Sequence, residues 1–175
     1  LWLLVPSGAW ITCWHSSLQH EALHGHPTRN ATINRAIALA PLALWLAFDR
    51  YSATHLQHHH DERLTDPLDD PESRYVTPQH WRQLGMIGRM LVRAQTTLAG
   101  RLIIGPFWAI GLFLRDEARD LIAGVPGRRR IWAQHMTAVA VITLWLHFVC
   151  EMSLWLYIAA FSIGGTSLML IRSFA

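Results

Sequence analysis

The chain has 175 residues and a formal net charge of +3, and 51% of its residues are hydrophobic while only 15% are charged. That length fits one domain, but so low a charged fraction argues against a soluble protein. The small net charge gives no indication of nucleic-acid binding. Cys13 and Cys150 both lie in apolar runs without a Cys-x-x-Cys motif, so we expect small buried side chains rather than a disulfide framework.

Charged residues are distributed unevenly along the chain. Residues 1–19 contain no Asp, Glu, Lys or Arg, and Glu151 is the only such residue between 131 and 171. Uncharged runs of roughly 20 residues are long enough to cross a hydrocarbon core of about 30 Å. The sequence therefore predicts membrane-spanning helices at about 1–19, 131–150 and 152–171. We expect Pro6 and Gly8 to break up the first of them.

Two apolar segments are shorter. Residues 33–48 and 98–115 each contain an uncharged core of only about 13 residues, which is too short to span. We expect each to form an interfacial or re-entrant helix that returns to the side it left. Gly105 and Pro106 interrupt the second segment and the acidic run 116–120 closes it. The polar residues 49–96 are expected to be cytoplasmic.

The arginines indicate the orientation. Arg128, Arg129 and Arg130 precede one predicted span and Arg172 follows the other. Basic loops mark the cytoplasmic side, so both ends of this pair, and both histidine clusters, are predicted to lie in the cytoplasm. The predicted fold is all-α, an integral-membrane helical bundle in a single domain, 1–175, with interfacial helices and a cytoplasmic histidine-rich metal site. Because the chain starts without Met in an apolar run and stops after a span, we expect it to be incomplete at both ends.

Seven of the eleven histidines lie in two short stretches, 20–26 and 55–60. Histidines four residues apart share one face of a helix, and the spacing i, i+3, i+4 in the second stretch likewise gathers three. His60 points elsewhere. Neutral imidazole suits Fe, Zn, Cu and Ni, and five or six exceed what one tetrahedral zinc needs, so we predict two metals. The candidate metal ligands are His20, His24, His26, His55, His58 and His59, and all of these except His26 are candidate catalytic residues.

Other residues near the clusters leave alternatives open. His26 could be a ligand, a donor behind the ligands or a turn residue. Glu21, Asp61 and Glu62 adjoin the clusters, where each could orient an imidazole or be an exposed charge. Four further histidines are expected to be ordinary polar residues at helix ends or interfaces: His15, His80, His135 and His147.

The arrangement His20-x-x-x-His24 after an apolar run, then His55-x-x-His58-His59 some thirty residues later, resembles the first two histidine boxes of the membrane fatty acid desaturase superfamily. The stretch 19–73 is most similar to bacterial desaturase-like proteins. The resemblance implies two iron ions, dioxygen as co-substrate, a membrane lipid or acyl chain as substrate, and an external electron donor of ferredoxin or cytochrome type. It also implies a bacterial inner-membrane location and a third His-x-x-His-His box beyond Ala175.

The resemblance implies an acyl desaturase, and other functions stay open. One alternative is an alkane, sterol or carotenoid hydroxylase or ketolase of the same superfamily. A second is a zinc-dependent membrane hydrolase, and a third is a haem protein with axial histidines on facing spans. An acyl chain would lie in an apolar tunnel. Four tryptophans could line that tunnel or anchor the chain at the membrane interface: Trp10, Trp14, Trp45 and Trp108.

Overall fold

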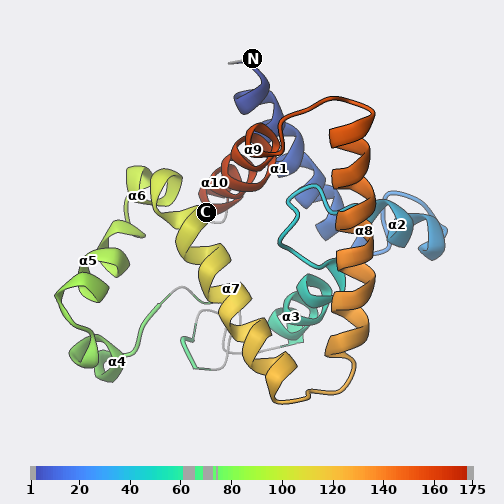
Figure 1. Cartoon of the computed structure of the whole chain (residues 1–175). Helices are drawn as coiled ribbons and strands as arrows, with labels where there is room; N and C mark the ends of the chain where they lie inside the picture. Colours follow the sequence, from blue (N-terminus) through green and yellow to red (C-terminus); the bar gives the residue numbers. More distant parts are fainter. Residues whose placement is uncertain (1–2, 61–65, 69–72, 74, 173–175) are drawn as a thin grey trace.

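The computed structural model describes residues 3–60, 66–68, 73 and 75–172, and within this part of the chain every regular element is a helix (Figure 1). The predicted all-helical class is therefore confirmed for these residues. In chain order the elements are α1 (Leu4–Leu23), α2 (Ala31–Ala38), α3 (Phe48–His60), α4 (Pro78–Gln83), α5 (Met86–Ala94), α6 (Leu98–Ile103), α7 (Gly105–Ile122), α8 (Arg128–Phe148), α9 (Leu154–Tyr157), the π-helical η1 (Ile158–Gly164) and α10 (Gly165–Arg172).

Two helices in the described part are long and apolar enough to cross a membrane by length and composition. They are Arg128–Phe148 and the continuous helix Leu154–Arg172, which joins α9, η1 and α10. Both coincide with predicted spans, and Glu151 turns the chain between them at a φ of 48°. The predicted span 1–19 is not one of the two, because α1 carries polar side chains along its length. Cys150, which we expected to be buried, is exposed in the connection.

The first helix is unbroken, contrary to the expectation for Pro6 and Gly8. Pro6 lies in the first turn of α1, where backbone N–H groups have no partner within the helix, so its missing N–H removes no bond. Gly8 allows close packing of α1 on η1, since a Cβ there would lie 2.8 Å from the Phe161 ring. Both residues thus have a place inside a regular helix.

Residues 33–48 were expected to form one helix, and this prediction is wrong for the second half. Helix α2 ends at Ala38, and residues 39–47 are irregular. Pro41 explains the end of the helix, because proline lacks an N–H and disfavours a helical conformation in the residue before it. The irregular segment ends in the buried pair Ala47 and Phe48, at the start of α3.

Side chains of the surrounding helices bond the backbone around this irregular segment. Gln19 donates to the Ala38 carbonyl at 2.8 Å, His135 Nε2 lies 2.8 Å from the Leu44 carbonyl, and the Tyr157 hydroxyl donates to the Leu42 carbonyl at 2.9 Å. Buried carbonyls without such partners would cost free energy. The segment is therefore fixed inside the bundle by α1, α8 and α9.

The segment 98–115 also differs from its prediction. It forms two helices, and α7 begins at Gly105 and continues through the acidic run to Ile122. Pro106 fits because it lies in the first turn of α7. The acidic run does not end the helix, because Glu117 is only 3% exposed and bonds to arginines of neighbouring helices.

A matched pair of glycine variants tests the packing of α1 on α10. A Cβ at Gly165 would lie 2.6 Å from Thr12 Cβ, whereas a Cβ at Gly111 has nothing within 4 Å. Overpacking costs about 1–3 kcal/mol, so Gly165→Ala is expected to lower the thermal unfolding temperature in detergent. Gly111→Ala should leave it unchanged or raise it, since Ala favours a helix by roughly 0.5–1 kcal/mol. Equal stability of the two variants would contradict this packing.

Candidate metal centre

Four of the predicted ligands meet where the end of α1 approaches α3. His20 lies in the last turn of α1 and His24 is the C-cap residue directly after that helix, while His55 and His59 lie one turn apart on α3. Each offers one ring nitrogen, and these four nitrogen atoms all lie within 4.8 Å of one another. The ring centroids of His20 and His55 are 4.7 Å apart, and those of His24 and His59 are 4.9 Å apart. The two i, i+4 pairs therefore face each other.

The cluster is closed on one side and open on the other. His55 is buried and its ring stacks on Tyr51 at a centroid distance of 5.4 Å, while His24 and His59 are exposed. Desolvation, and repulsion from the neighbouring imidazoles when they are protonated, lower the pKa of His59 from its ordinary value of 6.5. This favours the neutral imidazole at neutral pH, which is the form that binds a metal.

The other predicted residues are placed differently. His58 lies beside the cluster, 6.0 Å from His55 between ring centroids, but it does not belong to the set of four. The structure does not bring His26 into that set; it is exposed and follows Gly25, whose φ of 84° ends α1. Its role as a ligand stays a prediction. The side chain of His60, and all of Asp61 and Glu62, lie outside the described residues.

One acidic neighbour reaches the cluster. Glu21 Oε1 lies 3.3 Å from His20 Nδ1. The exposed carboxylate can therefore accept a hydrogen bond from Nδ1–H, which leaves Nε2 of the same ring free to bind a metal. This is the orienting contact considered from the sequence. Both side chains are accessible to solvent, so the contact is a weak one.

Helix α3 is held in place at its first turn by two arginine–carboxylate pairs. Arg35 of the α2 helix forms two hydrogen bonds to Asp49, at 2.5 and 2.8 Å. Arg50 Nε lies 2.6 Å from Glu117 Oε1 of α7 in a buried ion pair, with the two side chains 13% and 5% exposed. A bidentate arginine contact fixes direction as well as distance. These pairs set the position from which α3 carries His55 and His59.

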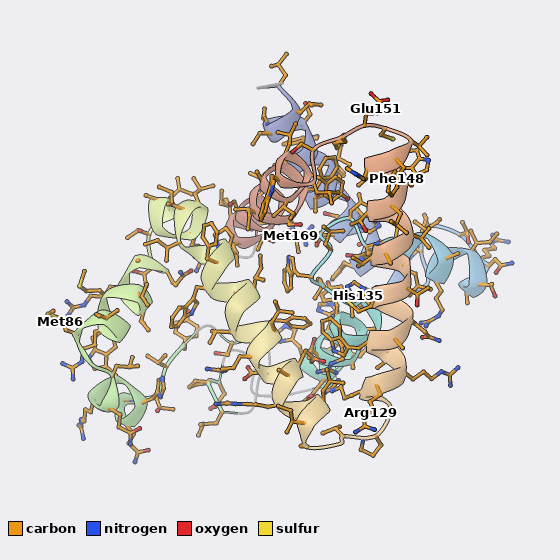
Figure 2. All side chains as sticks on the ribbon, viewed as in Figure 1. Met86, Arg129, His135, Phe148, Glu151 and Met169 are labelled. Carbon is orange, nitrogen blue, oxygen red and sulfur yellow. The ribbon has the colours of Figure 1, made fainter. Side chains whose placement is uncertain are left out.

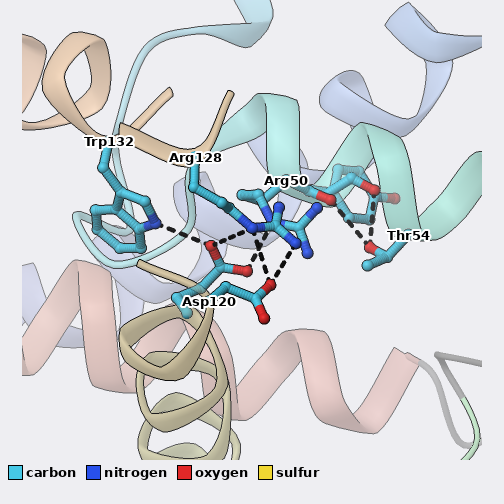
Figure 3. Close-up of polar contacts among 7 residues, drawn as sticks. Arg50, Thr54, Asp120, Arg128 and Trp132 are labelled. Carbon is cyan, nitrogen blue, oxygen red and sulfur yellow. Dashed lines mark hydrogen bonds and ion pairs between the residues drawn. The ribbon is translucent and has the colours of Figure 1, made fainter. Parts of the chain in front are cut away.

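Arg50, Arg128 and Trp132 belong to a polar network between α3, α7 and α8 (Figure 3). Glu117 of α7 contacts all three of these residues. Its second carboxylate oxygen accepts from Trp132 Nε1 at 2.9 Å and lies 3.7 Å from Arg128 Nε. Arg128 also pairs with Asp120 at 2.5 Å. A buried carboxylate needs such partners, because an unpaired charge at this depth is very costly. This role was not predicted, because the acidic run 116–120 was expected only to close the apolar segment before it.

The family model described as "Fatty acid desaturase" matches residues 1–175, the whole chain. The chain belongs to the fatty acid desaturase family. No significant match was found among curated proteins or among solved structures. The resemblance noted in the paired histidine boxes is thus confirmed at the level of the family.

The remaining histidines of the chain lie away from the cluster. His15 Nε2 is 3.3 Å from the Ile37 carbonyl, and His135 is bonded to Leu44 as described above. His147 is exposed and contacts Phe148, and His80 is exposed on α4. His15 and His135 thus contact backbone carbonyls just before and just after the end of α2. These roles could not be predicted from the sequence, because the two acceptors are backbone carbonyls, one in the last turn of α2 and one in the irregular segment, and no motif identifies them.

Two acidic variants of α7 test whether the polar network positions the second histidine box. Glu117→Gln removes the charge that pairs with buried Arg50, and breaking a buried pair costs about 3–5 kcal/mol. We expect a lower unfolding temperature together with weaker metal binding at His55 and His59, measured by metal analysis after equilibrium dialysis.

The control is Asp116→Asn on the same helix. Its side chain is 56% exposed and pairs with Arg115 and Arg119 at the surface, where an ion pair contributes about 0–1 kcal/mol. If the two variants behaved alike in both measurements, the positioning role of Glu117 would be wrong.

Proposed function

We propose that this chain belongs to an oxygen-dependent di-iron membrane oxidoreductase that introduces a C=C bond into a fatty acyl chain. The observation that carries the proposal is the convergence of His20, His24, His55 and His59, in a chain matched over its whole length by the fatty acid desaturase family. Two sequence-distant pairs of imidazoles with nitrogens this close are difficult to explain without a metal.

The chemistry of the donor set fits iron. All four ligand atoms are imidazole nitrogens, which suit Fe, Zn, Cu and Ni alike, so family membership is what favours iron. Nitrogens within 4.8 Å of one another can surround one ion. A second ion would need further donors, and His58, next to His55 and His59, is one candidate among the described residues.

When bound, an iron pair would supply dioxygen-dependent removal of two hydrogens from adjacent carbons of the acyl chain. One alkane unit, one dioxygen, two electrons and two protons give one alkene unit and two waters. The described residues contain no cofactor-binding motif that could supply the electrons, so the proposal includes an external donor of ferredoxin or cytochrome type.

The chain's own residues hold and orient the ligands. Gln19, the residue directly before His20, donates to the Ala38 carbonyl and so connects the last turns of α1 to the end of α2. Glu117 and Arg50 hold α3, and Tyr51 covers the His55 ring. The exposed edges of His24 and His59 leave one side of the cluster accessible. We assign this side to the approach of the substrate or the electron donor.

The proposed location is a bacterial inner membrane, with the cluster on the cytoplasmic face. Arg129 and Glu151 lie at opposite ends of α8 (Figure 2), so the basic end of this candidate span is the end with Arg128 and Arg130. The positive-inside rule supports a cytoplasmic position for that end. The proposed substrate is a membrane lipid or acyl chain, and no nucleic acid is involved.

The tryptophans support anchoring more than a tunnel. Trp10 and Trp14 are 60% and 62% exposed on α1, facing away from the bundle, and Trp45 donates to Thr166 at 3.0 Å. The cavity between α1 and the irregular segment, near Thr12 and Gln19, has room for about one water-sized sphere, ≈ 10 Å³. It is far too small to hold an acyl chain.

Substitution of one ligand on each helix tests the proposal. His24→Ala combined with His59→Ala removes one imidazole from each pair, whereas the control His147→Ala removes an exposed histidine at the far end of α8. Loss of a supporting group alone costs 10–100-fold in metal affinity, so the double variant is expected to bind iron at least about 100-fold more weakly. Iron per chain and acyl-lipid products are measured by mass spectrometry.

The same measurements separate the alternatives. Alkene products with iron support the desaturase, and alcohol or ketone products with iron indicate the hydroxylase or ketolase instead. One zinc per chain with oxygen-independent activity indicates a hydrolase, and a Soret band indicates haem. Iron retained by the double variant would rule out this cluster as the metal centre.

A further inference from the structure

Helices α4 and α5 project from the bundle as a separate hairpin (Figure 1). The exposed side of α5 is apolar at three positions: Met86 is 78%, Ile87 72% and Met90 62% exposed. Figure 2 shows Met86 at the outer edge of the molecule, directed away from the other helices. Side chains this apolar are seldom left facing water in a group.

The charge of this region has one sign. Residues 75–115 contain five arginines and no Asp or Glu. Arg82 and Arg93 are exposed, and Arg89 and Arg93 both lie beside the Trp81 ring, at 5.7 and 5.4 Å from its centre. A helical hairpin with basic and apolar side chains but no carboxylate complements an anionic surface.

The basic and apolar side chains lie next to each other on α5. Met86, Arg89, Met90 and Arg93 recur at spacings of three and four, so they share one face of the helix. The same four residues, with Leu84 and Gly85, line an open groove of ≈ 450 Å³. Arginines bordering an apolar stripe are typical of helices that lie in the plane of a membrane surface.

The hairpin is preformed and attached at a membrane boundary. Arg89 donates to the carbonyls of Trp81 and Arg82 at 3.2 and 3.1 Å, which ties α5 to α4. Arg101 of α6 donates to the Leu170 carbonyl at 3.1 Å, at the basic end of the candidate span Leu154–Arg172. Only residues 95–97 separate α5 from α6, so the C-terminal end of α5 lies close to that end of the span.

We propose that the α4–α5 hairpin is an in-plane docking surface for an anionic phospholipid bilayer. Met86, Ile87 and Met90 enter the boundary between headgroups and acyl chains, while Arg82 and Arg93 contact lipid phosphates. The proposal rests on the membrane location proposed above, but not on the metal or the reaction. A soluble acidic partner would match the arginines and leave the apolar stripe in water, so a bilayer is the better match.

Hydrogen exchange of the intact protein in lipid nanodiscs tests this surface. Backbone amides 86–94 are expected to exchange more slowly in discs with phosphatidylglycerol than in pure phosphatidylcholine discs. Arg82→Gln with Arg93→Gln keeps the Arg89 tie and removes two charges, each worth about a fivefold factor at an anionic surface. The double variant should lose up to roughly 30-fold of that protection. Met86→Gln with Met90→Gln should lose it as well.

Arg129→Gln with Arg130→Gln is the matched control, because it removes two exposed arginines from α8 and leaves 86–94 unaltered. Exchange in these amides that is the same in both kinds of disc would overturn the proposal. Equal protection of these amides by soluble inorganic phosphate would also overturn it. So would protection that depends only on protein concentration, because a second copy of the chain would then be covering the helix. Iron content and acyl products, measured on the same samples, report separately on the proposed function.

Discussion

The position of α3 depends on bonds made to backbone that is neither helix nor strand. Residues 39–47 run through the bundle, and the carbonyls of Leu42 and Leu44 are bonded by Tyr157 and His135 from the last two long helices. Gln19 of α1 donates to the carbonyl of Ala38, the last residue of α2, directly before this segment. Without these donors the segment would carry unpaired polar groups inside the protein. Because it leads directly into Phe48, its conformation fixes where the second histidine box begins.

The ion pair of Arg50 with Glu117 then orients α3 against α7 and α8. The imidazoles themselves oppose this arrangement when protonated, since desolvation first and then the neighbouring positive charges lower the pKa of His59. Neutral imidazoles carry no charge that would repel their neighbours, and their closely spaced nitrogens could all coordinate a bound metal. The polar network is thus best understood as support that holds four imidazoles together in advance.

Two kinds of sequence pattern predicted the structure well: residues repeated at helical spacing and long runs without charged residues. The histidine spacing identified the four residues that converge, and the uncharged runs located both helices that qualify as spans. Pro6 and Pro106 were misread because first-turn prolines look like breaks. The irregular course of 39–47 and the inward direction of Glu117 could not be predicted, because both depend on partners 60 or more residues away, such as Arg50 for Glu117 and His135 for Leu44.

X-ray absorption spectroscopy of the iron-loaded protein tests the central claim most directly, because it counts the imidazoles bound to the metal. We predict iron with a shell of at least three nitrogens at roughly 2.1 Å, with the outer-shell scattering of imidazole rings. We also predict that this scattering decreases stepwise in His20→Ala and His55→Ala, one from each helix. An iron environment of oxygen donors alone, unchanged in both variants, would contradict this claim.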